Sequence, residues 1–222
     1  MNKELVISSN PKSATAETIR TLRTNLQFTF VNNNVKSVII TSSIPGEGKS
    51  FISANLAVSF GLVGTKVLLI DCDMRKGRQN KLFDFKEEEG LSNLLLDDIK
   101  NYKKYIRKTK YENLSVLTSG IVPPNPSELL GSSKNMELLE KLKKEYDLII
   151  FDCPPVNAVT DALVLAPFSD EAVIVCAYKE TPVDLLIATK KTLENTGIKI
   201  AGVVMNKMEK VKNKYYYNKY YK

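Results

Sequence analysis

The feature that most restricts the fold of this chain is the stretch from Val38 to Phe51. An apolar run, Val38-Ile39-Ile40, leads into Ser43-Ile44-Pro45-Gly46-Glu47-Gly48-Lys49-Ser50, and the next residues have a helical pattern. A strand, a glycine-rich turn and a Gly-Lys-Ser triplet that opens a helix follow the order of a phosphate-binding loop. Since a bare Gly-Lys-Ser triplet arises by chance, the flanking strand and helix carry this prediction.

The chemistry of the loop follows from its backbone and two side chains. Backbone N–H groups from Gly46 to Ser50 can surround a polyphosphate, and the following helix points its positive dipole end at the same place. Lys49 is expected to reach the outer phosphates, and the Ser50 hydroxyl to bind Mg²⁺. The consensus loop begins with glycine, whereas Ser43 holds that position here. The residues expected to bind the nucleotide are Ser43, Pro45, Gly46, Glu47, Gly48, Lys49, Ser50 and Phe51.

Apolar runs and amphipathic segments alternate along the whole chain. Uninterrupted apolar runs suit parallel strands that are covered on both faces. The repeated βα order therefore predicts a doubly wound, mostly parallel sheet with helices on both faces, and 222 residues suit a single α/β domain. The expected strands lie at 35–42, 66–70, 114–118, 147–152, 171–178 and 199–205. The expected helices lie at 13–31, 49–62, 78–83, 91–96, 133–145 and 182–195, with another short helix after the prolines at 123–126.

Two of the expected strands end in carboxylates. Asp71 and Asp73 follow the second strand, and Asp152 ends the fourth. Ligands of open α/β sheets bind at the carboxyl ends of the strands. A strand-end acid also commonly completes the Mg²⁺ shell opposite the serine of a phosphate-binding loop, here Ser50. The sequence thus predicts Mg²⁺-dependent nucleotide chemistry.

The absence of histidine restricts the acid–base chemistry. An attacking hydroxyl needs a base that takes its proton, and Asp71 or Asp73 is the candidate. Lys49 and Mg²⁺ would neutralise the charge of the transferring phosphate. The last expected strand is followed by Asn206, which is either a turn residue or a side chain that contacts an adenine edge.

Composition excludes several other classes of protein. No apolar run approaches the ~20 residues that cross a bilayer, and the N-terminus lacks a signal core, so a cytoplasmic protein is expected. Cys72, Cys153 and Cys176 fall in expected strands and are interpreted as buried thiols in a reducing compartment. The net charge of +7 lies largely in Lys-rich surface segments and in the C-terminal tail, so no nucleic-acid partner is expected.

The N-terminal region has two expected parts. Residues 1–12 have the pattern of an extended lead-in, and 13–31 repeat apolar residues with helical spacing. Glu17, Arg20 and Arg23 share another face of that helix. They form either a local ladder of i,i+3 ion pairs, worth roughly a few tenths of a kcal/mol, or an exposed stripe that pairs with a neighbouring subunit. The pattern alone favours the local ladder.

The C-terminal tail, residues 207–222, has an unusual composition. Five of the ten tyrosines lie in the last eight residues, between Lys and Asn. No apolar periodicity predicts that the tail packs, so a flexible terminus is expected. Its phenols are candidate phosphate acceptors for a site on the same or a neighbouring subunit. These candidate autophosphorylation sites are Tyr215, Tyr216, Tyr217, Tyr220 and Tyr221.

Together these motifs resemble the bacterial tyrosine kinases of capsular and exopolysaccharide biosynthesis, in the form found as a separate cytoplasmic subunit. Residues 43–50 resemble the family's Walker A loop, 68–76 its extra Walker A′ motif and 148–155 its Walker B motif. Glu17, Arg20 and Arg23 match its Glu-x-x-Arg-x-x-Arg oligomerisation motif, which favours the intersubunit interpretation. The Pro-Pro-Asn-Pro-Ser-Glu-Leu-Leu segment and the tyrosine-rich tail also match.

The resemblance implies a protein-tyrosine autokinase that uses ATP, releases ADP and depends on Mg²⁺, with a kinase domain at 1–206 and a flexible tail. Asp71 would be the base for the tyrosine hydroxyl, and Asp73 would support Mg²⁺ and the transferring phosphate. Asp152 would hold Mg²⁺ through its water shell, and Asn206 would contact adenine.

The resemblance also implies partners. Members of the family form a ring, an octamer, in which the tail of one subunit enters the site of the next. They need the cytoplasmic segment of a membrane-spanning activator, which would recruit the chain to the inner face of the membrane, and they act beside a cognate tyrosine phosphatase. The implied role is control of capsule or exopolysaccharide synthesis and export.

The main alternative is a P-loop ATPase switch of the partitioning or cell-division type, which shares the expected fold. Those proteins carry a second lysine near the start of the loop, where this chain has Ile44 followed by Pro45. They also generally lack a tyrosine cluster. These two differences favour the kinase.

Overall fold

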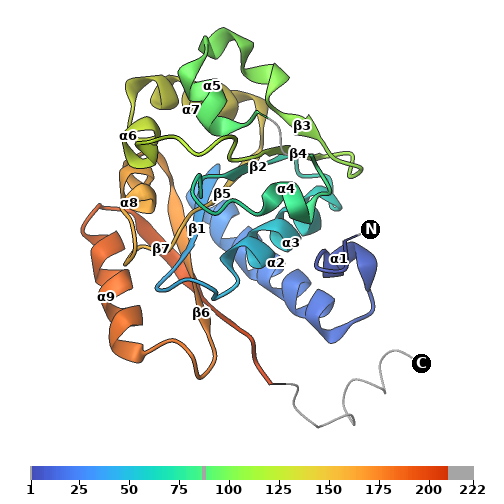
Figure 1. Cartoon of the computed structure of the whole chain (residues 1–222). Helices are drawn as coiled ribbons and strands as arrows, with labels where there is room; N and C mark the ends of the chain where they lie inside the picture. Colours follow the sequence, from blue (N-terminus) through green and yellow to red (C-terminus); the bar gives the residue numbers. More distant parts are fainter. Residues whose placement is uncertain (1, 87–88, 210–222) are drawn as a thin grey trace.

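The computed structural model describes residues 2–86 and 89–209, so the five candidate tail tyrosines lie outside the described residues. A seven-stranded sheet forms the centre of the molecule, in the order β3-β4-β2-β5-β1-β6-β7 (Figure 1). All neighbouring strands are parallel except β3, which is antiparallel to β4. The strands are β1 (Ser37–Ser42), β2 (Val67–Asp71), β3 (Arg107–Lys108), β4 (Leu114–Leu117), β5 (Leu148–Asp152), β6 (Glu171–Ala177) and β7 (Lys199–Asn206).

Helices cover both faces of the sheet, which confirms the doubly wound α/β fold. Because side chains alternate along a strand, Ile39 packs under one helical layer, and Val38 and Ile40 under the other. One layer contains α1 (Val6–Ser9), α2 (Ala14–Asn33), α3 (Lys49–Gly61) and α4 (Gln79–Leu82). The other contains α5 (Leu91–Leu96), η1 (Ile99–Lys104), α6 (Pro126–Leu130), α7 (Ser133–Glu145), α8 (Asp161–Leu165), η2 (Ala166–Phe168) and α9 (Val183–Glu194).

The expected N-terminal helix begins and ends with local signals. The Ser13 hydroxyl accepts a hydrogen bond from Ala16 N (3.1 Å), and Asn34 ends the helix in the left-handed conformation, φ 53°. Along its inner face Phe30 stacks on Phe60 of α3, with ring centroids 6.1 Å apart. Each such buried side chain contributes roughly 1.5–3 kcal/mol, so packing against α3 fixes the direction of α2.

The expected extended lead-in at 1–12 is wrong for its central part, where α1 forms. Ile7 of this helix is buried against α2 and α3. Asn55 of α3 binds both ends of the segment: its Oδ1 accepts from Ile7 N (3.3 Å), and its Nδ2 donates to Glu4 O (2.9 Å). A helix of four residues is too short to show a period, so the sequence pattern carried no sign of it.

The three cysteines are buried and free, as expected. Cys176 lies in β6, but Cys72 and Cys153 come directly after β2 and β5 rather than inside them, and their thiols contact each other. Burial raises the pKa of both thiols, which keeps them protonated and unreactive.

The order of the strands positions the loops of the site. β5 lies between β1 and β2, so the carboxyl ends of the three strands that precede the predicted motifs are adjacent. The register pairs Asp152 of β5 with Asp71 of β2 and with Ile40 of β1. The chain crosses from β1 to β2 on one side and later adds β6 on the other, which makes this edge a topological switch point. Among residues 2–86 and 89–209, no helix is long and apolar enough to cross a membrane.

Candidate active site

A pocket of about 360 Å³ opens at the carboxyl ends of β1, β2 and β5. The three predicted motifs all contribute to it, which brings the loop after β1 and the two strand-end acid segments into one place. We call it the first pocket. Its lining consists of Pro45, Gly46, Gly48, Lys49, Ser50, Asp73, Arg75, Lys76, Arg78, Pro154, Pro155, Ala158 and Val159.

Two glycines give the loop its conformation. Gly46 has φ 86° and Gly48 has φ 94°, in a region where residues with a Cβ are strained. A Cβ at Gly48 would also collide with the side-chain amide of Asn206. Gly48 is the N-cap of α3, so the helix starts where its unpaired N–H groups face the pocket.

Glu47 and Asn206 stabilise the phosphate-binding loop through hydrogen bonds. The Glu47 carboxylate is buried, accepts from Ile44 N (2.8 Å) and from the Thr181 hydroxyl, and so joins the turn to the segment before α9. Asn206 Nδ2 donates to Glu47 O (2.9 Å), which turns the Asn206 Oδ1 away from that contact as an acceptor. Glu47 and Asn206, which were both predicted to contact the nucleotide, therefore stabilise the loop, and neither of them lines the first pocket.

Ser43 and Phe51, also expected to contact the nucleotide, point into the protein. The Ser43 hydroxyl is buried and accepts from the Thr189 hydroxyl of α9 (2.9 Å), which explains how serine replaces the consensus glycine. Phe51 packs against the core under α1 to α4. Of the residues predicted to bind the nucleotide, those that line the first pocket are Pro45, Gly46, Gly48, Lys49 and Ser50.

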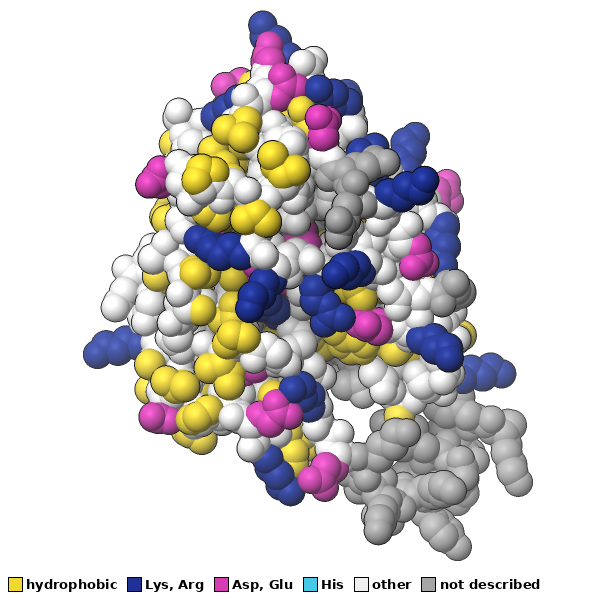
Figure 2. All heavy atoms as spheres, viewed as in Figure 1, with side chains coloured by type: hydrophobic (Ala, Val, Ile, Leu, Met, Phe, Trp, Pro, Cys, Tyr) yellow, Lys and Arg dark blue, Asp and Glu magenta, His cyan; other side chains and the backbone are white. Residues whose placement is uncertain are grey.

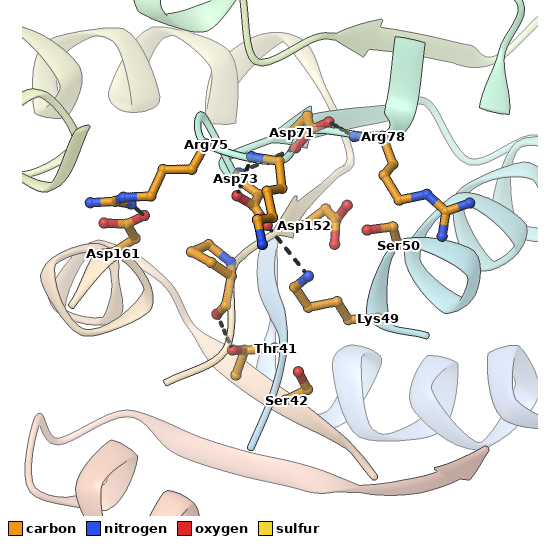
Figure 3. A network of polar contacts seen from close by, with 12 residues as sticks. Thr41, Ser42, Lys49, Ser50, Asp71, Asp73, Arg75, Arg78, Asp152 and Asp161 are labelled. Atoms are coloured by element: carbon orange, nitrogen blue, oxygen red, sulfur yellow. Dashed lines mark hydrogen bonds and ion pairs between the residues drawn. The ribbon is translucent and has the colours of Figure 1, made fainter. Parts of the chain in front are cut away.

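Lys49 and Asp73 face each other inside the pocket (Figure 3). Lys49 Nζ lies 3.5 Å from Asp73 Oδ2, and the side chains are 13% and 8% exposed. Asp73 Oδ1 accepts from Lys76 N (2.9 Å), which fixes the carboxylate. The cation that was predicted to reach the phosphates is thus held in place by the acid at the end of β2.

Asp152 has the properties expected of a metal ligand. It is fully buried, its Oδ2 accepts from Gln79 Nε2 (2.8 Å), and its Oδ1 has no hydrogen-bond partner in the described part of the chain. Burial raises the pKa of Asp152, while Lys49 opposes that shift. Since an incompletely paired buried charge costs several kcal/mol, a cation bound here would stabilise it.

The neighbourhood of Asp152 fits Mg²⁺. Ser50 and Asp73 lie beside it and supply a hydroxyl and a second carboxylate (Figure 3). Within the described residues no three His, Cys, Asp or Glu side chains are grouped for a metal. A cation would therefore take its other ligands from phosphate oxygens and water, which is the coordination that Mg²⁺ favours.

Asp71, the expected base, is enclosed. Its Oδ2 accepts from the backbone N–H groups of Arg78 (2.9 Å) and Gln79 (3.0 Å), and its Oδ1 from Asp73 N (3.2 Å). Burial, and then the charge of Asp152, raise the pKa of Asp71 well above its usual range. Asp71 thus anchors the start of α4 in this conformation, and Asp73 is the acid of this motif that lines the pocket.

A buried carboxylate that the sequence did not single out, Asp161, positions a cation of the pocket. Asp161 is completely buried at the start of α8, and it accepts from Arg75 Nη1 and from the Ser127 hydroxyl. Figure 3 shows Arg75 beside Asp161. Arg75 follows the strand-end acids, whereas Ser127 belongs to the proline-rich segment. The Arg75 and Asp161 positions are 86 residues apart, so no local pattern could reveal the pair.

The fold and this site define a P-loop nucleotide-binding α/β protein. The family described as an AAA domain matches residues 35–200. The chain is 42% identical over 216 residues to the putative tyrosine-protein kinase CapB of Staphylococcus aureus, which covers 97% of this chain and 94% of that protein. The crystal structure of the chimerical protein CapA2B2 superposes with a TM-score of 0.89 at 42% identity, covering 95% of this chain and 92% of that one. The chain belongs to the bacterial protein-tyrosine kinases, and the resemblance found in the sequence is confirmed.

A more distant likeness concerns the alternative class. The septum site-determining protein MinD of Pyrococcus horikoshii, complexed with Mg-ADP, has a TM-score of 0.66 at 24% identity, and covers 80% of this chain and 72% of that one. At this identity the likeness shows the shared fold alone. It confirms that the kinase and the ATPase switches are built on the same sheet.

The Asp161→Asn substitution tests how Arg75 is held. Asparagine keeps the shape of the side chain but removes its charge, and a hydrogen bond to a charged group contributes about 1.5–3 kcal/mol. We expect the affinity for a non-hydrolysable ATP analogue to fall about tenfold, measured by calorimetry. Asp147→Asn is the control, because Asp147 binds Lys66 N at the opposite edge of the sheet. Unchanged affinity in a folded Asp161→Asn protein would refute a role for this contact.

Proposed function

We propose that the protein is an ATP- and Mg²⁺-dependent autokinase that phosphorylates tail tyrosines of a neighbouring copy of itself. The observation that carries this proposal is that Lys49, Ser50 and Asp73 line one pocket, with the buried Asp152 beside them. The clustered tyrosines at the end of the same chain supply the acceptor.

The pocket binds the polyphosphate through charge and backbone. The amides of the loop and the N-terminus of α3 take the phosphate oxygens, and Lys49 binds the outermost of them. Arg75 and Lys76 add positive charge on the side where an acceptor enters. Ser50 and Asp152, with Asp73, would hold Mg²⁺, and the bound ion would neutralise the phosphate charge and orient the transferring group.

Transfer moves the γ-phosphoryl group from ATP to a phenol. The tyrosine oxygen forms a bond to the γ-phosphorus, the bond to the β-phosphate oxygen breaks, and ADP leaves. The phenolic proton passes to Asp71 in this proposal. Burial raises the pKa of Asp71, which makes its carboxylate a stronger base than an exposed one.

In this proposal Asn206 orients the adenine ring of the nucleotide. Because its Nδ2 donates to Glu47 O, its Oδ1 is presented as an acceptor, which suits the exocyclic amine of adenine. The last strand ends beside the phosphate-binding loop, and this position places Asn206 for the proposed contact.

The partners follow from the family. We propose that the chain is cytoplasmic, forms a ring, an octamer, and is recruited to the inner face of the membrane by the cytoplasmic segment of an activator. A cognate tyrosine phosphatase would reverse the modification, and the cycle would regulate capsule or exopolysaccharide synthesis and export. CapB of Staphylococcus aureus, to which the chain is 42% identical, is itself described as a putative tyrosine-protein kinase.

The charged stripe on α2 is the proposed subunit interface. In the single chain Arg20 Nη1 pairs with Glu17 (2.7 Å), which forms one step of the local ladder. Arg23 turns away from that ladder and donates to Ser59 O of α3 (3.3 Å). Glu17 and Arg20 remain 39% and 34% exposed, so both can still contact a neighbouring copy.

A labelled-ATP assay tests the proposed reaction. With Mg²⁺ and the activator's cytoplasmic peptide, the full chain is expected to form phosphotyrosine. Lys49→Met should lower the rate at least about a hundredfold, because it removes the charge that faces the transferring phosphate. Lys66→Met, at the amino end of β2, is the matched control. Hydrolysis of ATP without phosphotyrosine in any combination would identify an ATPase switch instead.

Light scattering tests the stripe. Replacing Arg20 and Arg23 by Ala should lower the particle mass, and a variant with Ala at the exposed Lys100 and Lys110 controls for the loss of two charges. Melting temperature is measured on both, because Arg23 also contacts α3. An unchanged mass would remove the stripe from the interface.

A further inference from the structure

A second pocket, of about 590 Å³, adjoins the first one. The two pockets share Arg75 and Lys76 in their linings, so they are adjacent. Lys81 lines the second pocket from the α4 side, and the loop at 118–122 after β4 closes its other side. Figure 2 shows Lys and Arg side chains gathered around the middle of this face.

The second pocket lies directly behind the proposed base. A Cβ built on Gly77 would collide with Ser119 Oγ and approach Asp71 Oδ2 to 2.9 Å. Ser119 and Gly77 both line this pocket, so only the glycine backbone separates its wall from Asp71. A peptide segment bound in the second pocket is thus positioned beside Asp71, where the proposed transfer occurs.

The lining of the second pocket combines three cations, Arg75, Lys76 and Lys81, and one carboxylate, Glu89, with an apolar lip. Arg75, Lys76 and Lys81 are exposed, and no ion pair between described residues involves Lys76 or Lys81. Ile121 and Val122 are 59% and 67% exposed on the opposite lip. An aromatic ring that carries a negative group would satisfy both sides.

The charge of the tail decides which form of tyrosine fits. Residues 210–222 contain five lysines and no acid, so an unmodified tail brings only positive charge to a lining in which Arg75, Lys76 and Lys81 outnumber Glu89. A phosphate on tyrosine adds about −1.5 to −2 charges and three acceptor oxygens, for which arginine and lysine are the usual partners. Charge complementarity therefore arises only after the first transfer.

We propose that the second pocket is a phosphotyrosine site, which retains a phosphorylated tail tyrosine while another tyrosine of the same tail occupies the first pocket. This inference rests on the proposed kinase function. In an extended segment residues i and i+2 lie on the same side, about 7 Å apart. Tyr215 and Tyr217 have this spacing, so an extended tail would present both side chains on the same side.

Peptide binding tests the site without requiring catalysis. The protein is the full chain with its five tail tyrosines replaced by Phe, and the probes are labelled peptides of the sequence of residues 213–222 with and without phosphate on Tyr217. Fluorescence anisotropy is expected to show at least about tenfold tighter binding of the phosphopeptide. Lys81→Ala should remove most of that difference, whereas Lys100→Ala, outside both pockets, should leave it unchanged.

Three results would overturn the assignment. Equal affinity for the two peptides would mean that the pocket does not select phosphate, and full retention of the difference in Lys81→Ala would place the phosphate elsewhere. Displacement of the peptide by inorganic phosphate at the same concentration would indicate a general anion site. An inactive kinase that still selects the phosphopeptide would reject the proposed function alone, and an active kinase that does not select it would reject this inference alone.

Discussion

The buried carboxylate of Asp152 sets the condition that the rest of the site satisfies. Its Oδ1 lies inside the protein without a partner among the described residues, so the folded chain pays an electrostatic cost that a bound cation removes. Ser50 and Asp73 are positioned around it because β5 lies between β1 and β2. The same adjacency brings Lys49 against Asp73. Sheet order and local charge thus bring together the residues of the proposed metal-nucleotide site.

The α/β fold and the position of the site were predictable, because both depend on local patterns. Buried parallel strands read as apolar runs, and the loop from Gly46 to Ser50 and the acids Asp73 and Asp152 follow those runs at the sheet edge where ligands bind. The roles of individual loop residues were harder to predict from the sequence. Ser43 and Phe51 point inward, and Glu47 supports the loop, because α9 and the core provide partners that no loop pattern encodes.

What the sequence did not reveal comes from contacts between distant segments. The pairing of Arg75 with Asp161 and the docking of α1 by Asn55 each join parts of the chain that show no common pattern. The second pocket arises in the same way, where the segment after β2 meets the loop after β4. These contacts link the phosphate site, the proline-rich segment and the acceptor side, and they account for the proposed sequence of nucleotide binding, transfer and retention.

Transfer between subunits is the central claim, and a mixing experiment tests it most directly. A Lys49→Met chain, which has an intact tail, is combined with a chain that has an intact site and Phe at all five tail tyrosines, in the presence of ATP, Mg²⁺ and the activator peptide. Mass spectrometry is predicted to find phosphotyrosine on the tail of the Lys49→Met chain. If that tail stays unmodified while the wild-type chain modifies its own, transfer takes place within one subunit and the account is contradicted.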